Sequence, residues 1–561
     1  MEKKIVYKLL AIICVLIFSC YTVLAQVSVH NSTWKKVTQT PRRNVTITFG
    51  HDTLFIKRAG GDKFLYTFSF LQRQDSLIVS DLKTKNNWGA YHIAYSNSAD
   101  NLSLREIKAM RGSISLAGTF RYIPGKGAVA RNWQQLDATS DSVAGISLYK
   151  AYDLLRGRSS KTVIVAVIDN GFDIEHEDLR SIVWTNTNEI PGNGIDDDHN
   201  GYVDDVHGWN FRSNKAGDLI PDEQSSATQM YVTFKDKFDN TDPTSLNAFD
   251  RSEWTFYQKA KSQYLETIKS SKDSGDLKFA FNINYNSSKM IGDGAANNRF
   301  YGSPAITGSA ALSHGTHVAG IIAAKRDNGK GVDGIADNVL IMPIIATTGY
   351  GDERDKDIAN AIRYAVDNGA RIINMSFSKR YSTDKQLVDA AIRYAEKNHV
   401  LIIHAAGNEG NNIDTANYYP ITYYYDGTKA SNIITVGWSR PLFNYRLAHP
   451  YSNYGKNNVD LFAPGSDIFS TVPGNGYDYK SGSSMSTPVV SGLAALLMSY
   501  FPSLTLGQLK NILLKSVYKP NVIVNRPDSK VQVPFSSLSV SGGILNAENA
   551  VKMAIETTAK N

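Results

Sequence analysis

The chain has 561 residues, of which 42% are hydrophobic and 20% charged, values typical of a globular protein and not of a disordered or collagen-like one. Its two cysteines, Cys14 and Cys20, both lie near the N-terminus, which excludes a disulfide scaffold, a cysteine-rich zinc site and a cysteine nucleophile in the rest of the chain. The net charge of +7 is uneven, because residues 27–131 hold 16 Lys and Arg against 6 Asp and Glu, whereas residues 132–561 are mildly acidic. This distribution does not favour nucleic acid as a partner.

Residues 1–25 predict a secretory signal peptide. Three lysines precede an apolar run over residues 9–18, and small residues end at Ala25. The run is shorter than the roughly 20 residues that span a bilayer. An alternative interpretation is a bacterial lipoprotein site at Cys20. Both interpretations predict export, to the bacterial periplasm, the outer-membrane surface or the medium.

Residues 27–128 predict a small β-barrel or β-sandwich domain. Short β-branched and aromatic runs alternate with turn residues at about ten-residue spacing. The only helical candidate, residues 104–110, is short. By this pattern alone the region weakly resembles the lipocalin-like β-modules of exported bacterial proteins. Its positive charge favours docking to an anionic cell surface.

Residues 132–561 predict an α/β domain with a mostly parallel sheet. Unbroken apolar runs, typical of strands buried on both faces, alternate with helical patterns such as the one around residues 358–366. The expected strands cover residues 163–168, 338–342, 371–375 and 400–403. In such sheets binding sites lie at the carboxyl ends of the strands.

Three residues at the ends of predicted elements suit nucleophilic acyl transfer. Asp169 follows the first buried strand, while His314 and Ser484 each stand at the start of a predicted helix. A serine hydroxyl needs an imidazole to remove its proton, and the imidazole needs a carboxylate to fix its tautomer. The chain order Asp, His, Ser is the order found in subtilisin.

The motifs around these residues resemble those of the subtilisin-like serine peptidases, the subtilase family. Residues 314–320 read HGTHVAG and match the family's histidine motif fully, whereas Asn170, Ser483 and Ser486 replace residues more usual in the family. The resemblance covers about residues 132–560. It implies a subtilisin-like sheet with helices on both faces, and an endopeptidase that cleaves protein or peptide substrates through an acyl-enzyme on Ser484.

Further residues are assigned by the same resemblance. Asn408, in the sequence AAGN, is implied to donate its amide to the oxyanion of the tetrahedral intermediate. The segment Ser376, Phe377 and Ser378 resembles the strand that pairs with the peptide and walls its first specificity pocket, and Gly349 is a candidate for the opposite edge. Gly is usual in the family at the position of Ser378, which leaves the pocket width open.

An acidic loop predicts a calcium site. Oxygen-bearing side chains at Asp196, Asp198, Asn200 and Asp204, with Gly201 at the sharp turn, follow the alternation of an EF-hand loop. His207 stands where an EF-hand has its bidentate Glu, so the loop is not a true EF-hand. The alternative is a solvated acidic loop without an ion.

Residues 212–300 form a long polar insertion between the aspartate and histidine motifs. It contains one amphipathic helical pattern, at Trp254, Tyr257, Lys261, Tyr264, Leu265 and Ile268, and it could border the substrate cleft. An alternative to an active peptidase is an inactive relative that docks through its basic β-domain. An esterase or lipase would instead predict the pattern G-x-S-x-G around the serine.

Overall fold

The computed structural model describes residues 130–559 apart from 271–278, 296 and 308–312, and before residue 130 it describes the backbone of eight strands. The predicted signal peptide and the candidate lipidation site at Cys20 lie outside the described residues. The chain divides into two compact units. The first ends near residue 143, and the second comprises residues 144–561 together with residues 134–136.

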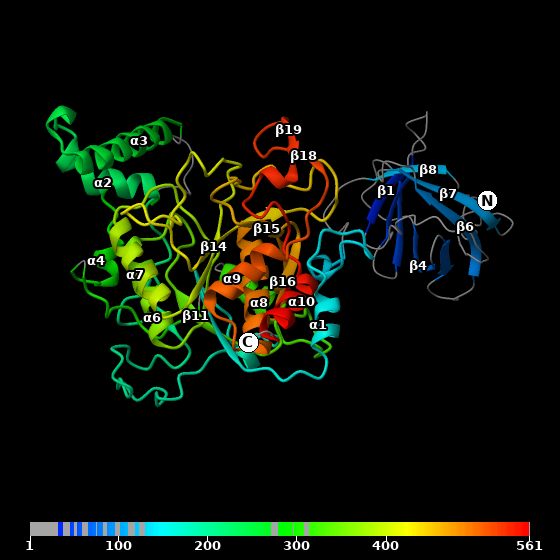
Figure 1. Ribbon diagram of the computed structural model, residues 1–561, viewed down its shortest axis with the longest axis horizontal. Helices are drawn as coiled ribbons and strands as arrows, with labels where there is room; N and C mark the ends of the chain where they lie inside the picture. The colour runs from blue at the N-terminus through cyan, green and yellow to red at the C-terminus, as the bar shows by residue number, and fades with distance from the viewer. Residues whose placement is uncertain are drawn as a thin grey trace, which may run out of the picture. The chain divides into compact units, whose positions relative to one another are not determined.

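The first unit contains a closed antiparallel barrel (Figure 1, blue). Each strand pairs with the next one along the chain, and the last returns to pair with the first. The strands are β1 (Ser32–Lys36), β2 (Val45–Phe49), β3 (Thr53–Arg58), β4 (Tyr66–Arg73), β5 (Ser76–Asp81), β6 (Asn87–Tyr95), β7 (Asn101–Ala109) and β8 (Gly118–Tyr122). Residues 104–109, in the short segment with a helical pattern, lie in strand β7. The lipocalin-like character of this unit stays a prediction.

The second unit is built on a seven-stranded sheet in which every neighbouring pair is parallel. In spatial order the strands are β10 (Trp209–Asn210), β11 (Val339–Ile345), β9 (Val163–Asp169), β12 (Ile372–Met375), β13 (Leu401–Ala405), β14 (Ile433–Ser439) and β15 (Leu461–Pro464). Nearly all their residues are buried, as expected of strands covered on both faces. The predicted α/β class and its parallel sheet are therefore confirmed.

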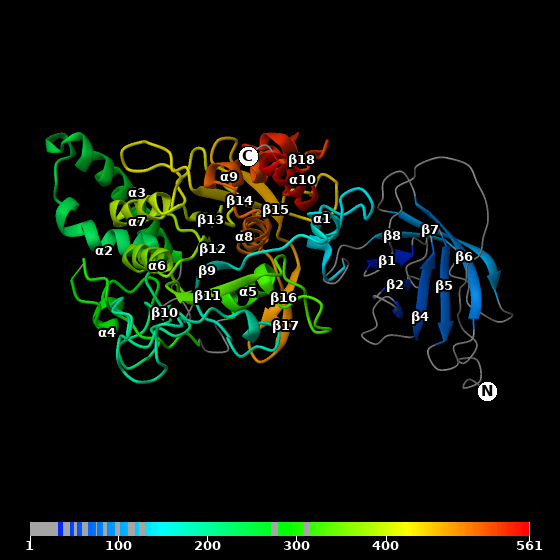
Figure 2. The ribbon, with the colours of Figure 1, turned by 60° about the horizontal axis from the view of Figure 1, so that its bottom comes forward.

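Helices cover both faces of this sheet. Helices α5 (His314–Ala323) and α8 (Ser483–Tyr500) pack against each other on one side of the strands, and α6 (Asp355–Asp367) and α7 (Lys385–Lys397) do so on the other (Figure 2). The second pair shares its core with alternate residues of β9, Ala166 and Ile168, because successive strand residues face opposite sides.

Shorter elements complete the unit: α1 (Leu148–Leu155), α9 (Leu506–Lys515), α10 (Ala547–Thr558) and the hairpins β16 (Ile468–Val472) with β17 (Gly476–Lys480) and β18 (Ile523–Asn525) with β19 (Gln532–Pro534). Within the described part of the chain, none of the helices combines the length and the hydrophobicity needed to traverse a bilayer.

The insertion folds into helices α2 (Ser226–Phe238), α3 (Ala248–Ser270) and α4 (Ser287–Ile291). The predicted amphipathic helix is α3, whose Tyr257 and Tyr264 are buried whereas Leu265 and Ile268 are exposed. Its buried apolar stripe is thus narrower than the sequence pattern predicts.

Candidate active site

The acid and the base of the predicted site form a direct hydrogen bond. Asp169 ends β9 and His314 begins α5, and His314 Nδ1 lies 2.8 Å from Asp169 Oδ1 and 2.9 Å from Oδ2. The Asp169 side chain is 2% exposed and that of His314 is 29% exposed. A carboxylate can only accept here, so Nδ1 carries the proton and Nε2 is left as the basic nitrogen.

Ser484 lies at the start of α8 and is joined to Ser376 by two hydrogen bonds. The Ser484 hydroxyl donates to the Ser376 carbonyl at 2.8 Å, and the Ser376 hydroxyl donates to the Ser484 carbonyl at 2.9 Å. The second bond is possible because Pro488, four residues on, has no N–H to offer that carbonyl. Pro488 lies in the second turn of α8, and Ser376 replaces the missing helical bond.

Asn408 follows β13 and is held in a defined orientation. Its Oδ1 accepts from the backbone N–H of Ser483 at 2.8 Å and from the Ser483 hydroxyl at 3.1 Å. Because a backbone N–H can only donate, the oxygen of the amide must face Ser483, and the Nδ2 group is available to donate elsewhere. The Ser483 hydroxyl also accepts from Gly407 N at 3.3 Å.

One open cavity of about 320 Å³ brings the predicted residues together. All eight candidates of the catalytic, oxyanion and substrate-binding sets line it: Asp169, His314, Ser484, Asn408, Gly349, Ser376, Phe377 and Ser378. They come from the carboxyl ends of β9, β11, β12 and β13 and from the first residues of α5 and α8. The site therefore lies at the edge of the sheet where parallel α/β folds place their sites.

The insertion borders this cavity through backbone pairing. Gly349 N donates to Pro221 O at 2.7 Å, and Glu223 N donates to Tyr350 O at 2.9 Å. Gly351 has φ +87°, and a Cβ there would lie 1.9 Å from Glu223 O, so the close approach requires glycine. The segment around Gly349 is thus fixed on one side by the insertion.

Two buried histidines near the site are neutral. Burial lowers the pKa of His317 to about 3 and that of His404 to about 4. His317 Nε2 lies 3.1 Å from the carbonyl oxygens of Ile468 and Asp478, to which it donates. Neither residue lines the cavity, which agrees with a packing role.

The arrangement contains the groups that acyl transfer requires. Nε2 of His314 can take a proton, Ser484 offers a hydroxyl, and Asn408 offers an amide donor for a developing negative charge. The first turn of α8 adds the positive end of the helix dipole. The Ser484 hydroxyl would have to leave the Ser376 carbonyl before it could donate to His314.

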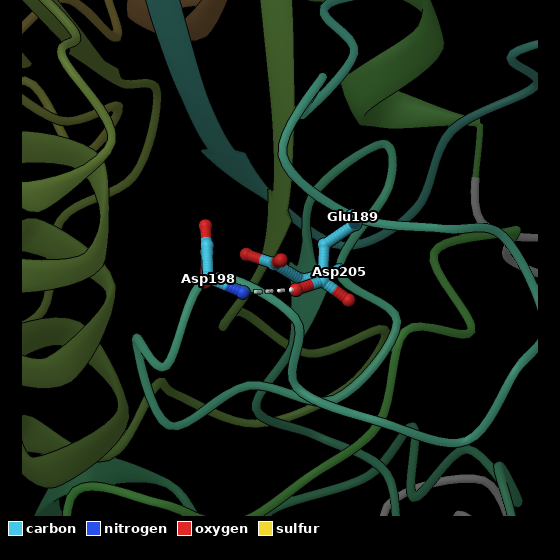
Figure 3. A group of neighbouring side chains, drawn as sticks. All are labelled: Glu189, Asp198 and Asp205. Atoms are coloured by element: carbon cyan, nitrogen blue, oxygen red, sulfur yellow. Dashed lines mark hydrogen bonds between the residues drawn. The ribbon is translucent and has the colours of Figure 1, made fainter.

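Three carboxylates converge in and beside the acidic loop. Oxygen atoms of Glu189, Asp198 and Asp205 all lie within 4.8 Å of one another, and Figure 3 shows these side chains gathered around one point. The dashed line in the figure is the bond from the Asp198 backbone N–H to Glu189 Oε1, 3.3 Å long.

The four residues predicted to bind calcium are not all directed to this point. Asp198 belongs to the cluster, and Asn200 Nδ2 lies 3.2 Å from both Asp198 Oδ2 and Asp205 Oδ2. In contrast, the Asp196 carboxylate accepts from the backbone N–H groups of residues 200 and 201, and that of Asp204 accepts from residues 193 and 194.

Sequence reasoning missed several residues of both sites. Glu189 lies before the acidic alternation, Asp205 falls out of its even-numbered register, and Ser483 was noted only as a departure from the residue usual in the family. Asp352, Glu353 and Glu409 also line the cavity. Glu409 directly follows Asn408 and could have been suspected, but nothing in the sequence distinguishes Glu353 from an ordinary surface glutamate.

Comparison with known proteins places these motifs in a family. The model of the subtilase family matches residues 160–535. A thermophilic serine proteinase from Bacillus sp. (strain AK1) is 41% identical over 187 residues, which are 33% of this chain and 43% of that protein. Thermitase from Thermoactinomyces vulgaris is 38% identical over 33% of this chain and 61% of that protein, and the cell wall-associated protease of Bacillus subtilis (strain 168) is 38% identical over 36% and 21%.

The chain thus spans less than two thirds of the length of these three curated relatives. Among solved structures, a protease from Pseudoalteromonas arctica PAMC 21717 is similar over 75% of this chain and 97% of that chain, with 23% identity and a TM-score of 0.43.

Proposed function

The chain belongs to the subtilase family, and we propose that it is an exported serine endopeptidase that hydrolyses peptide bonds through an acyl-enzyme. The observation that carries the proposal is the 2.8 Å bond between His314 Nδ1 and Asp169, in a cavity that Ser484 and Asn408 also line. The named relatives are proteases, which supports protein or peptide substrates for this chain as well.

In the proposed reaction His314 Nε2 removes the proton of the Ser484 hydroxyl as Oγ attacks the peptide carbonyl. Asp169 holds the imidazole in the required tautomer and stabilises its cation. Asn408 Nδ2 donates to the oxyanion, a contribution of roughly 10²–10³ in rate for one such donor. The imidazolium then protonates the leaving amine. In the second half of the reaction His314 removes a proton from water, which attacks the acyl-enzyme, and then returns the proton to Ser484.

The peptide itself is proposed to bind between two segments, one at Ser376, Phe377 and Ser378 and the other at Gly349. The Ser376 carbonyl accepts from the Ser484 hydroxyl in the absence of a peptide. A peptide that approaches this strand would compete for the carbonyl, which would release the hydroxyl for His314.

Casein cleavage tests the proposal, with and without a serine-directed phosphonate. Ser484→Ala and His314→Ala should each lower turnover by several orders of magnitude, because the triad members act as one unit. Asp169→Asn should be less harmful but still severe, because it favours the wrong imidazole tautomer. Casein cleavage by Ser484→Ala at the wild-type rate would contradict the proposal.

We also propose that the acidic loop binds a calcium ion. Oxygen atoms bound to one Ca²⁺ at about 2.3–2.6 Å lie no more than about 5 Å apart, which the spacing of Glu189, Asp198 and Asp205 satisfies. Within the described residues none of the three forms an ion pair with Lys or Arg, so a cation would balance their charge. We therefore favour this set, with Asn200 beside it, over Asp196 and Asp204. The ion would stabilise the loop and takes no part in the reaction.

Export rests on residues 1–25 and remains a proposal, as does docking of residues 27–128 to an anionic surface. The alternative of an inactive relative has no observation in its favour, because the acid, base, hydroxyl and amide all line one cavity.

A further inference from the structure

The cavity around Ser484 is strongly acidic. Besides Asp169, which is engaged by His314, three carboxylates line it, those of Asp352, Glu353 and Glu409. Among the described residues that line the cavity there is no Lys or Arg. A cleft lined by one sign of charge concentrates oppositely charged ligands.

Glu409 is fixed at the wall of the first specificity pocket. Its Oε2 accepts from Asn408 N at 2.9 Å and from Asn453 Nδ2 at 2.8 Å, while Oε1 has no such restraint. The point where a Cβ on Gly407 would lie is 2.8 Å from this Oε2 and 3.0 Å from Ser378 Oγ, so the carboxylate lies beside Ser378. Since Glu409 is exposed, a substrate side chain can contact it directly.

Glu353 is 5% exposed, and its Oε1 is buried without a hydrogen-bond partner. The neighbouring cation, Lys379, does not neutralise it, because its Nζ lies 3.0 Å from Asp355 Oδ1 and donates to the Glu353 backbone carbonyl at 2.6 Å. Lys379 is itself buried and does not line the cavity. Beside Glu353, half-buried Asp352 uses one oxygen to accept from Ser226 N at 2.6 Å.

We propose that this cleft selects peptide segments that carry lysine or arginine, and that Glu409 and Glu353 determine this preference. The inference rests on the proposed peptidase function. Glu409 would pair with the residue just before the scissile bond, because it stands beside both Ser378 and the oxyanion donor Asn408. Glu353 and Asp352 would favour a cation further toward the N-terminus of the peptide, along the segment that begins at Gly349.

Quenched fluorescent peptides that differ in one residue test the inference at pH 8, where Glu353, whose pKa burial raises to about 7, is ionised. Lys, or the uncharged residue Met of similar size, is placed in turn at each of the four positions before one scissile bond. The ratio of kcat/KM for the Lys peptide to that for the Met peptide is measured at each position. Wild type should prefer Lys by roughly tenfold at one or more positions. Glu409→Gln should lower the ratio at the position next to the scissile bond, and Glu353→Gln at a more distant one. Glu548→Gln is the matched control and should change no ratio, because Glu548 of α10 pairs with Lys552 and does not line the cavity.

Equal kcat/KM values for the Lys and Met peptides, or ratios that survive both Gln substitutions, would overturn the inference while casein cleavage still supported the peptidase. Binding supplies an independent measurement. Fluorescence anisotropy with the Ser484→Ala protein should show tighter binding of the Lys peptide than of the Met peptide, with a difference that shrinks as salt increases. Equal binding of the two peptides would contradict the inference even if no peptide were cleaved.

Discussion

Hydroxyl groups outside the proposed triad hold Ser484 and Asn408 in place. Ser376 bonds the carbonyl that Pro488 leaves without a donor, and Ser483 fixes the oxygen of the Asn408 amide. Neither residue is expected to touch the scissile bond through its hydroxyl. Both act by restricting the positions of Ser484 and Asn408. A displacement of about 1 Å of these groups would lower the reaction rate strongly.

Ser483→Ala should therefore lower kcat with little change in KM. The variant keeps the Ser483 backbone N–H, and hence one of the two bonds to Asn408 Oδ1, so we expect a loss of roughly tenfold and not the full loss of an oxyanion donor. Ser483→Thr should restore the rate, because threonine keeps the hydroxyl. Ser486→Ala is the control, since the Ser486 hydroxyl donates to Ala463 O, away from the cavity. A kcat for Ser483→Ala equal to that of wild type would show that the side-chain bond is dispensable.

Glu353 should make the stability of the protein depend on pH. Burial raises its pKa to about 7 from an ordinary 4.5, although Lys379 opposes the shift. Between these pH values the unfolded chain has released the proton while the folded protein keeps it, so the free energy of unfolding falls as the pH rises through this window. Glu353→Gln should remove this loss, which is on the order of 3 kcal/mol.

Thermal unfolding at pH 4 and pH 8 measures this effect, best in Ser484→Ala protein so that self-digestion does not interfere. Glu353→Gln should raise the Tm at pH 8 and leave it nearly unchanged at pH 4, whereas the control Glu548→Gln should do neither. If the Tm rose equally at both pH values, the ionisation of Glu353 would not be the cause.

The triad could be predicted from the sequence because each member lies in a short local motif, but the acidic lining could not. Glu353 becomes significant only through its burial, and Glu409 only through the Gly407 backbone that places it beside Ser378. Both properties depend on contacts between segments distant in the chain.

Apolar runs predicted the strands well, since strands buried on both faces leave an unbroken apolar pattern.

The packing of the insertion could not be predicted from its sequence, because polar residues anchor it. Buried Arg212 lies 3.1 Å from both Glu223 Oε2 and Asp357 Oδ2, which joins the insertion to α6. Burial opposes ionisation of Asp357, but Arg354 and Arg212 outweigh it and hold its pKa below the ordinary value. Charged residues that form buried ion pairs cannot be told from surface residues in the sequence alone.

For the acidic loop, the sequence pattern and the side-chain geometry predict different calcium ligands, and these can be distinguished by substitution. If calcium binds only the folded state, a free concentration 100 times its dissociation constant adds about 2.7 kcal/mol to the free energy of unfolding. EDTA should therefore lower the Tm. Asp205→Asn should remove most of this response, because Asp205 belongs to the carboxylate cluster, whereas Asp196→Asn should retain more of it.

The control for the calcium measurement is Asp153→Asn, which changes an exposed residue of α1 whose carboxylate pairs with Arg156. It should keep the full response to EDTA. A Tm that EDTA does not change in wild type would support the alternative of a solvated acidic loop.

The whole chain consists of the barrel unit and the peptidase unit, and the barrel either remains covalently attached in the active enzyme or is removed by proteolysis. Subtilase relatives commonly carry an N-terminal prosegment that is removed, and such prosegments are compact α+β units. The first unit instead holds eight strands in a closed barrel, and the one segment with a helical pattern is strand β7. The unit from residue 144 onward has its own sheet and core.

We therefore expect the barrel to remain covalently attached in the active enzyme. Its 16 basic residues against 6 acidic ones over residues 27–131 would serve to hold the enzyme on an anionic envelope or glycan surface, and this attachment should weaken as salt screens the charges. N-terminal sequencing of active enzyme from its native host should give a start near Gln26. A start near Arg131 in all active material would instead identify the barrel as a removable prosegment, whatever its fold, and the surface-docking role would fail with it.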